Sequence, residues 1–334
     1  MIKILRSVLI GIFIVAVGVI LLGIGSINGG ENSIIWQDGK FIIPQNQTIN
    51  KHVKAFKNID ISGDALQVTL VRDNQDTSGY LVIGQVSNAD GLNITQENGT
   101  LKIEYKEAHS HVPNFAKTNQ DMDRISVKVP AGIKLDSIKT RVKSGDVAVK
   151  RLESKKVNLR TDYGRISTTN VTASTLKVKN YAGIIIDDNT RADKLDLVNT
   201  YGSILVHESK ATTSRLHVSS AEITATDSDL GKALISVDSG NTTLRNVQAN
   251  NILAQTTSGD YNIENVKFTG SNVIFTKMGN IDTTGFNEDG YRLQIQNSGT
   301  INFKGKEIAN SYDVNVNAAN RVMLSTYDGD IVVK

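Results

Sequence analysis

The chain has 334 residues, enough for two ordinary domains or for one long repeat array. A net charge of +3, 21% charged residues, 39% hydrophobic residues and 3 Pro exclude both a disordered charged chain and a Pro-rich linker. The absence of cysteine excludes disulfide scaffolds, thiolate catalysis and zinc–cysteine sites, and the 5 His are too few and too scattered for a histidine-rich metal site.

An uncharged apolar segment opens the chain. No charged residue lies between Arg6 and Glu31, and Val, Ile, Leu and Gly fill most of this interval. A helix needs about 20 apolar residues to cross the hydrocarbon core of a bilayer, and this segment supplies them. We therefore predict a transmembrane helix or signal anchor over residues 7–27.

Two basic residues precede this helix, so the positive-inside rule keeps residues 1–6 in the cytoplasm and places residues 31–334 outside the plasma membrane. The alternative is a cleaved signal peptide, with Gly23 and Gly25 at small-residue cleavage positions, which would make the protein secreted. The exported part keeps all but two of the basic residues and all 34 acids. This balance argues against a nucleic-acid partner.

Strands are expected before the repeats begin. Residues 28–55 are predicted to be a stalk with one or two strands. Residues 56–130 contain alternating segments such as Leu101–Tyr105, and the turn at Glu97–Thr100 is typical of a hairpin. These segments do not follow the period of the later repeats, so we predict an N-terminal antiparallel β region that caps the first coil.

A turn with Gly or Ala at its centre recurs about every 19 residues between positions 131 and 334. Successive turns are separated by 19, 18, 20, 19, 19, 19, 20 and 20 residues, and a degraded turn closes the chain. A fixed period of this length is the signature of a stacked repeat architecture. The aligned turns end at Val147, Ile166, Ile184, Ile204, Ile223, Thr242, Tyr261, Ile281, Ile301 and finally Ile331.

The strand residues keep the same period. Leu159, Val178 and Leu197 are spaced 19 apart, and each alternates with polar neighbours as one buried face of a strand requires. An Asn-Val corner recurs at Asn170 and Asn246, and Asn tolerates left-handed backbone geometry. Helical periodicity is absent after the anchor.

These patterns predict an all-β protein whose main part, residues 131–334, is a parallel β-solenoid of about 19 residues per coil. One coil cannot bury its apolar face, but coils stacked about 4.8 Å apart join their faces into a continuous core. The alternative, an antiparallel meander, does not require a fixed period. The last strand, Asp330–Lys334, is apolar and has no cap after it in sequence, so it could pair with a second copy of the chain.

The most suggestive surface feature is a tyrosine directly before the Gly or Ala of three consecutive turns. Stacked rings beside basic residues could hold a sugar. The alternative is a cross-strand aromatic ladder that only stabilises the sheet. The candidate binding residues are Tyr163, Tyr181, Tyr201, Arg160, Arg165 and Lys179.

Catalytic, metal and cofactor sites are not predicted. Asp187 and Asp188 are the nearest approach to an acidic pair, but adjacent strand residues point to opposite faces, and we interpret them as a solvated corner. His109 and His111 share one face of a polar loop without a nearby acidic cluster, and we interpret them as plain surface.

The repeats resemble the bacterial "putative adhesin" family of β-strand-repeat proteins, a domain of unknown function often found behind one membrane helix. The segments Ile125–Gly132 and Lys143–Val149, together with Leu135, carry the resemblance, which extends over residues 56–334. The sequence departs from the family pattern at Ala182 and Ala221. The resemblance implies a surface-exposed, non-enzymatic module. The sequence also resembles membrane-anchored members of the family that are encoded beside cell-envelope-stress systems.

We therefore expect a non-catalytic, adhesin-like module that binds a cell-envelope or host glycan, a host surface or a membrane protein partner. The alternative is an accessory or regulatory component of a cell-envelope-stress response. A more remote alternative is a polysaccharide-active β-helix enzyme.

Overall fold

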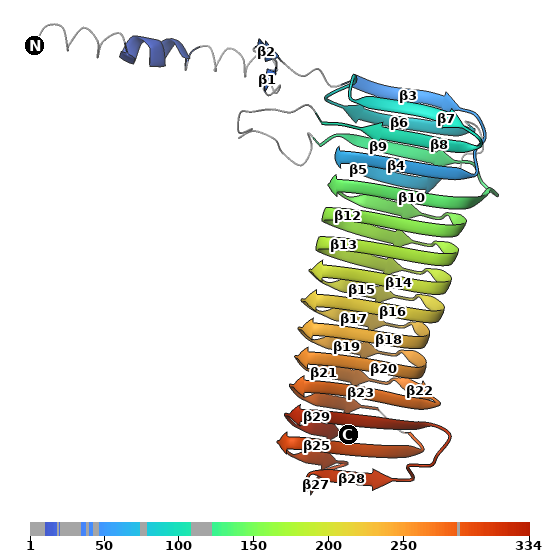
Figure 1. Ribbon diagram of the computed structural model, residues 1–334, viewed down its shortest axis with the longest axis vertical. Helices are drawn as coiled ribbons and strands as arrows, with labels where there is room; N and C mark the ends of the chain where they lie inside the picture. The colour runs from blue at the N-terminus through green and yellow to red at the C-terminus, as the bar shows by residue number, and fades with distance from the viewer. Residues whose placement is uncertain are drawn as a thin grey trace, which may run out of the picture.

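A computed structural model describes residues 11–18, 20, 35–37, 40–42, 47–73, 79–107, 122–285 and 288–334. Over these residues the protein is all-β, and its strands stack as successive coils along one long axis (Figure 1). The main sheet joins 28 of the described strands, while β1 (Ile35–Gln37) and β2 (Lys40–Ile42) form a separate antiparallel pair.

Each central coil consists of a long strand, a glycine turn, a short strand and a corner. Strands of the same kind pair in parallel from coil to coil, as predicted for a solenoid, and the antiparallel meander is wrong for these coils. The long strands are β10 (Lys134–Ser144), β14 (Arg191–Tyr201), β16 (Lys210–Ser220), β18 (Asp229–Ser239) and β20 (Gln248–Ser258). The short strands are β11 (Val147–Lys150), β15 (Ile204–His207), β17 (Ile223–Thr226), β19 (Thr242–Arg245), β21 (Tyr261–Glu264) and β24 (Ile281–Thr284).

Three coils depart slightly from this plan. In two of them the strand continues through the turn, giving β12 (Glu153–Thr169) and β13 (Thr172–Asp188). In the third, the long strand is divided into β22 (Lys267–Thr269) and β23 (Ser271–Met278). Parallel pairing continues through all three, so the stack is not interrupted.

The predicted core columns are confirmed. Leu159 pairs with Val178, Val178 pairs with Leu197, and all three side chains are fully buried. Such columns run the length of the stack and replace the compact core of a globular domain. Burial of each aliphatic side chain contributes about 1.5–3 kcal/mol, so most of the stability depends on correct register between neighbouring coils.

The third turn has a different phase from the one predicted. Ile166 pairs with Ile185, not with Ile184, and Ile185 pairs with Ile204. The turn glycine of this coil is therefore Gly183, and Ala182 is not a weakened turn residue. The intervals of 18 and 20 residues become two intervals of 19, because the turn backbone favours glycine, here Gly183.

The predicted left-handed corner is confirmed and is more general than the Asn pattern. Positive φ recurs every 19 residues at Arg151, Asn170, Asn189, Glu208, Asp227, Asn246 and Asn265. Where these residues are Asn or Asp, their side chains form hydrogen bonds from coil to coil, as in Asn189 Nδ2 to Asn170 Oδ1 at 2.6 Å. Arg151 and Glu208 show that the corner tolerates other residues without this bond.

The N-terminal end is not arranged in sequence order. The strands β4 (Asn58–Ala65) and β5 (Gln67–Arg72) form a coil that pairs in parallel with β10 and β11. Asn58 pairs with Ser137, which lies 79 residues later, so this coil joins the stack although it does not keep the 19-residue period. The outer coil comes later in the chain and consists of β8 (Thr100–Tyr105) and β9 (Arg124–Val129).

Antiparallel strands lie outside this outer coil. The strand β7 (Leu92–Glu97) pairs with β8, and β6 (Tyr80–Val86) pairs with β9 and with β3 (Gln47–Val53). The predicted stalk lies partly outside the described residues, but β3 belongs to the main sheet. These antiparallel strands pair with the backbone N–H and C=O groups that the outer coil would otherwise leave unpaired at this end of the stack.

The C-terminal end shows the same inversion. The last coil, β29 (Arg321–Asp328) and β30 (Ile331–Val333), lies between the coil of β23 and β24 and the coil of β25 (Gly290–Ser298) and β26 (Ile301–Phe303). Figure 1 places the C-terminus beside β25 and β29, inside the stack. The outer coil is covered by antiparallel β27 (Lys306–Ile308) and β28 (Ser311–Val314).

The predicted free edge at Asp330–Lys334 is therefore wrong. Ile331 pairs on one side with Ile281 and on the other with Ile301, and its side chain is fully buried. We therefore do not expect a second copy of the chain to pair with this strand, because both of its edges are already paired.

Residues 11–18 and 20 are helical, and the rest of the predicted span over 7–27 lies outside the described residues. None of the described helical residues belongs to a helix with the length and apolar character needed to cross a membrane.

Candidate functional site

The glycine turn fixes where the predicted tyrosine site lies. Gly164 has a φ of +141°, and a Cβ at this position would overlap the carbonyl oxygen of Gly145 in the preceding coil. Buried polar side chains hold the turn from inside: Thr161 Oγ1 donates to the Gly145 carbonyl at 3.2 Å, and Asn180 Nδ2 donates to the Gly164 carbonyl at 2.9 Å. The turn therefore repeats with one geometry and directs the preceding residue into solvent.

The three tyrosines do not occupy one register position. Tyr163 pairs with Ala182, and Ala182 pairs with Tyr201. Tyr181 lies one residue earlier in its own coil, so the prediction of three rings in register is wrong. Its side chain nevertheless fills the gap that the small Ala182 leaves between the other two rings.

The three rings form one exposed tyrosine cluster. The ring centroids of Tyr163 and Tyr181 are 5.8 Å apart at an angle of 79°, and those of Tyr181 and Tyr201 are 5.2 Å apart at 81°. Edge-to-face pairs of this kind stabilise by about 0.5–1.5 kcal/mol each. The residues are still 57%, 45% and 52% exposed, so both a stabilising ladder and a ligand-contacting surface agree with this geometry.

The hydroxyls of the tyrosine cluster interact with one another. The neighbouring Tyr201 raises the pKa of the Tyr181 phenol, with smaller contributions from desolvation and from Tyr163. The Tyr181 hydroxyl is thus neutral at physiological pH and remains a hydrogen-bond donor. The cluster offers ring faces, ring edges and neutral hydroxyls, which suits polar ligands with apolar patches such as sugars.

The predicted cations lie beside the cluster on two sides of the turn. Arg160 pairs in register with Lys179 on the long-strand face, and its guanidinium donates to Asp162 Oδ1 at 3.1 and 3.2 Å. Arg165 follows the turn, pairs with Ile184, and is exposed on the opposite side of the glycine. The structure therefore joins Arg160 and Lys179 to the tyrosine cluster on one face and separates Arg165 from them.

Sequence reasoning missed one member of this group. Arg141 pairs with Arg160, so Arg141, Arg160 and Lys179 form one column of exposed cations across three coils. Its position 19 residues before Arg160 is a signal in the sequence, but the coil of Arg141 has Ser144 in place of a tyrosine, so the tyrosine pattern does not point to it.

The interpretation of the acidic pair as a solvated corner is wrong for Asp187. Its side chain is fully buried, where Thr168 Oγ1 donates to Oδ1 and Oδ2 has no hydrogen-bond partner among the described residues. Burial raises the pKa of Asp187, against the opposing effect of hydroxyls led by that of Thr168. Asp188 points the other way and is partly exposed, so the two carboxyls cannot act together on one substrate.

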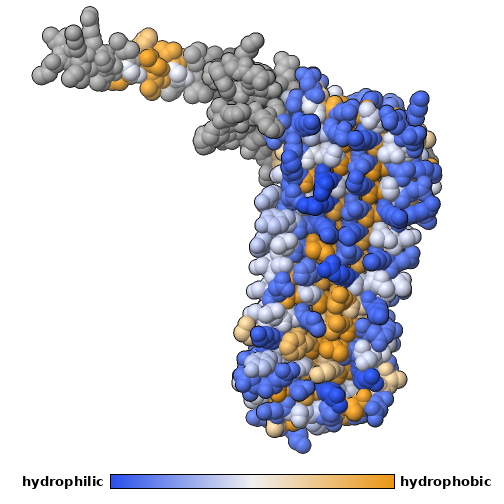
Figure 2. All heavy atoms as spheres, in the orientation of Figure 1, coloured by the Kyte–Doolittle hydropathy of each residue, from blue (hydrophilic) through white to orange (hydrophobic). Residues whose placement is uncertain are grey.

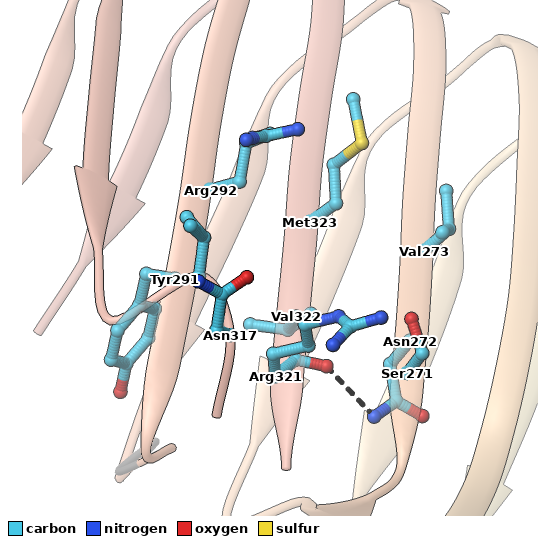
Figure 3. Close-up of a pocket in the computed structure, with 10 residues that line it drawn as sticks. Ser271, Asn272, Val273, Tyr291, Arg292, Asn317, Arg321, Val322 and Met323 are labelled. Carbon is cyan, nitrogen blue, oxygen red and sulfur yellow. Dashed lines mark hydrogen bonds between the residues drawn. The ribbon is translucent and has the colours of Figure 1, made fainter. Parts of the chain in front are cut away.

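Apart from the tyrosine cluster, a concave region near the C-terminal end of the rod is a second candidate site. Figure 3 shows that Arg292, Met323 and Val273 come from three adjacent strands, and Arg321 lies below them. The cavity has a volume of about 370 Å³, and none of the described residues that line it is a carboxylate. It therefore lacks the pair of acids that glycoside hydrolysis requires.

Metal ligands were also not predicted. No group of three His, Asp or Glu side chains close enough to hold a metal ion occurs in the described part of the chain. His109 and His111 lie outside the described residues.

Comparison with known proteins extends these observations. A family model described as Toastrack DUF4097 matches residues 56–235 and 199–334. None of the curated proteins matches the chain.

Several solved structures are similar at low identity. An adhesin-like protein of Bacteroides fragilis, described as a "putative adhesin", is 16% identical with a TM-score of 0.37, covering 86% of this chain and 96% of its own. One from Parabacteroides distasonis with the same description is 16% identical with a TM-score of 0.46, covering 72% and 97%. A third, from the same species, is described as a "putative lipid binding protein" and is 11% identical with a TM-score of 0.31, covering 86% and 97%.

Proposed function

The chain belongs to the Toastrack DUF4097 family, and on this premise we propose that it is a non-catalytic surface module that binds a carbohydrate polymer of the cell envelope or of a host surface. The observation that carries the proposal is the exposed tyrosine cluster, Tyr163, Tyr181 and Tyr201, on three consecutive coils. A stiff stack presents such side chains at regular intervals, so many weak contacts with a polymer add up.

Two features of the described residues support binding over turnover. Asp187 is fully buried in the core and is not accessible to a substrate. The adjacent Asp188 has no second carboxylate on its face in the neighbouring short strands, where its register partners are Thr169 and His207. A polysaccharide-active enzyme would need two acids facing one bond.

Binding to isolated cell walls and to a panel of soluble polysaccharides tests this proposal with the purified full-length chain in detergent. We expect the double variant Tyr181→Ala/Tyr201→Ala to lose about tenfold or more in affinity, because it removes two of the three ring faces on which a sugar can pack. The matched control is Tyr327→Ala, which removes an exposed tyrosine near the other end of the rod.

Equal losses in the double variant and in the control would overturn the role of the cluster. If the chain binds no polymer but retains a membrane protein during purification from native membranes, the accessory role in an envelope-stress response replaces the proposed one.

We also propose that residues 31–334 lie outside the plasma membrane, on the basis of the apolar segment and the basic residues before it. The chain lacks cysteine, so Lys155→Cys gives a single thiol on the exposed surface of the rod. Labelling of intact cells with a membrane-impermeant maleimide should modify this thiol. Labelling only after lysis would contradict the proposed orientation.

A further inference from the structure

The long-strand face of the first central coils has an unusual charge distribution. Three of the outward positions in each coil, those of Ser137, Lys139 and Arg141 in β10, stack into three columns along β10, β12, β13 and β14. Of these twelve positions, seven are Lys or Arg and one is acidic. The seven cations, called the basic face below, are Lys139, Arg141, Lys156, Arg160, Lys177, Lys179 and Lys194.

This concentration is not a general property of the surface. The chain as a whole carries a net charge of only +3. On the short-strand side of the same coils, the eight outward positions include one lysine, Lys150, and one acid, Asp188. The excess of positive charge therefore belongs to one side of the rod.

Few acids within the described residues neutralise the basic face. Lys139 forms an ion pair with Asp60 at 2.9 Å, and Lys177 lies 3.6 Å from Asp196. Arg160 is paired with the partly buried Asp162. Ion pairs with a described acid are not formed by Arg141, Lys156, Lys179 or Lys194. Exposed ion pairs of this kind contribute little to stability, so a polymeric anion can displace them.

The cation column Arg141–Arg160–Lys179 is the sharpest feature. Its members follow one another from coil to coil with no acid between them. Like charges directly opposite on neighbouring strands repel each other and destabilise a sheet. A matching row of negative charges would remove this repulsion on binding.

The same coils carry the tyrosine cluster. Tyr163 and Tyr181 follow Arg160 and Lys179 by three and two residues on β12 and β13. Cations and rings thus form two adjacent rows parallel to the rod axis, with a repeat of about 4.8 Å per coil. That repeat is comparable to the length of one pyranose unit in an extended polysaccharide.

The rest of this face has a different character. Beyond β16 the middle column becomes Leu234 and Leu253, which are 39% and 37% exposed, followed by Val273 and Met323. Figure 2 shows hydrophobic residues gathering over the C-terminal half of the face that it displays. The basic face therefore has a defined end, and the anionic ligand is expected to be limited to the N-terminal half of the rod.

We propose that the basic face and the tyrosine cluster together bind an acidic polysaccharide, with its carboxylates on the cation column and its sugar rings against the tyrosines. This inference rests on the proposed function and specifies its ligand as a uronate-bearing polymer lying along the rod axis. A neutral glycan leaves the cation column unpaired, and an anion without sugar rings leaves the tyrosines unused.

The test compares the full-length chain with three uronate polymers, polygalacturonate, alginate and hyaluronate, and with fully methyl-esterified polygalacturonate. We expect at least one uronate polymer to bind more tightly than the neutral ester by about tenfold, with an affinity that falls as salt screens the charges. Inorganic polyphosphate and anionic phosphatidylglycerol vesicles serve as control probes, because both carry many negative charges and neither presents sugar rings.

Matched charge variants locate the site. Arg141→Gln/Arg160→Gln/Lys179→Gln should weaken binding of the uronate polymer about tenfold, as expected for the loss of three surface ion pairs. The control Arg191→Gln/Lys210→Gln/Lys267→Gln removes the same charge from the corner column, where Arg191 and Lys210 are register partners. It should change the affinity by less than about twofold.

The outcomes separate this inference from the proposed function. If the uronate polymer and its neutral ester bind with equal affinity, and both depend on the tyrosines, the ligand is not specifically acidic. The proposed carbohydrate-binding function would then still hold. Tighter, tyrosine-independent binding of polyphosphate or vesicles would overturn both, as would the absence of binding to all polysaccharides. A control triple as damaging as the face triple would overturn the location.

Discussion

At the scale of single residues, the turn shows how strictly the backbone selects its side chains. The turn position with φ near +140° is glycine in most coils, but in one coil it is Ala221, with φ of +146°. This conformation is essentially restricted to glycine and costs an L-residue about 1–3 kcal/mol. Neighbouring coils hold Ala221 in place because its amide donates to the carbonyl of Ser239 at 3.0 Å.

Replacing this alanine gives the first prediction. Ala221→Gly should raise the free energy of unfolding by about 1 kcal/mol, since relief of backbone strain exceeds the entropy that glycine adds to the unfolded chain. Gly202→Ala, at the equivalent position one coil earlier, should lower it. Chemical denaturation measures both, and a destabilised Ala221→Gly would show that Ala221 is not strained.

Asp187 gives the second prediction. Burial raises its pKa above the ordinary 3.8, so as the pH rises the unfolded chain loses this proton before the folded chain does. The folded state is therefore destabilised from about pH 4 upward, until the raised pKa is passed. Asp187→Asn, which cannot ionise, should stabilise the protein at pH 7 by about 1–3 kcal/mol.

The pH dependence separates this effect from a simple packing change. The stabilisation by Asp187→Asn should disappear below pH 4, where the Asp187 carboxyl is protonated in both the folded and the unfolded wild-type chain. Thermal unfolding between pH 3 and 8 measures it. A stability gain of equal size at every pH would contradict the assignment to a buried, ionisable carboxyl.

At the scale of strands and coils, most of the repeat can be predicted from the sequence. One misaligned turn, at Tyr181, also leads to a wrong prediction for Asp187. The alternation around Leu159 fixes which strand residues face inward, and the 19-residue interval fixes the partner. Aligning Tyr181 with the other tyrosines moved the turn and the short-strand part of the third coil by one residue, which exchanged the inward and outward positions there. With Ile185 inward instead of Ile184, Asp187 also points inward, so the same error hid its burial.

The order of the end coils could not be read in this way. The coil of β4 and β5 and the coil of β29 and β30 each lie one step further inside the stack than their place in the chain indicates. Any coil with the correct alternation can pair with any other, so the period does not specify neighbours at the ends. The connecting segments set this order, and their patterns carry no such signal.

Engineered disulfides test the inserted last coil, because the chain contains no cysteine of its own. Asp282 and Val332 are register partners on adjacent strands, so Asp282→Cys/Val332→Cys should oxidise readily, at a Cα separation near 4.8 Å. Asp282→Cys/Asn302→Cys should not, because β30 lies between these strands. Efficient oxidation of the second pair, but not the first, would place the last coil at the end of the rod.

At the scale of the whole molecule, the rod behaves as a series of units that interact mainly with their neighbours. Stability is then close to a sum of coil and interface contributions. Function divides along the same axis: the basic face and the tyrosine cluster occupy the coils from β10 to β14, and a more apolar surface follows. Removal of one coil beyond β14 should shorten the rod and leave the proposed binding region intact.

The most direct test of the account is therefore the thermal unfolding of two chains that differ by one residue. Deletion of residues 209–227 removes one full coil of 19 residues and joins Glu208 to Ser228 with the corner and all buried columns preserved. We expect this chain to unfold cooperatively and to retain polymer binding. A second chain that also lacks Ser236, inside β18, exchanges the inward and outward side chains over the rest of that strand and should unfold at a clearly lower temperature. Equal stability of the two chains would contradict the stacked register on which the proposed site depends.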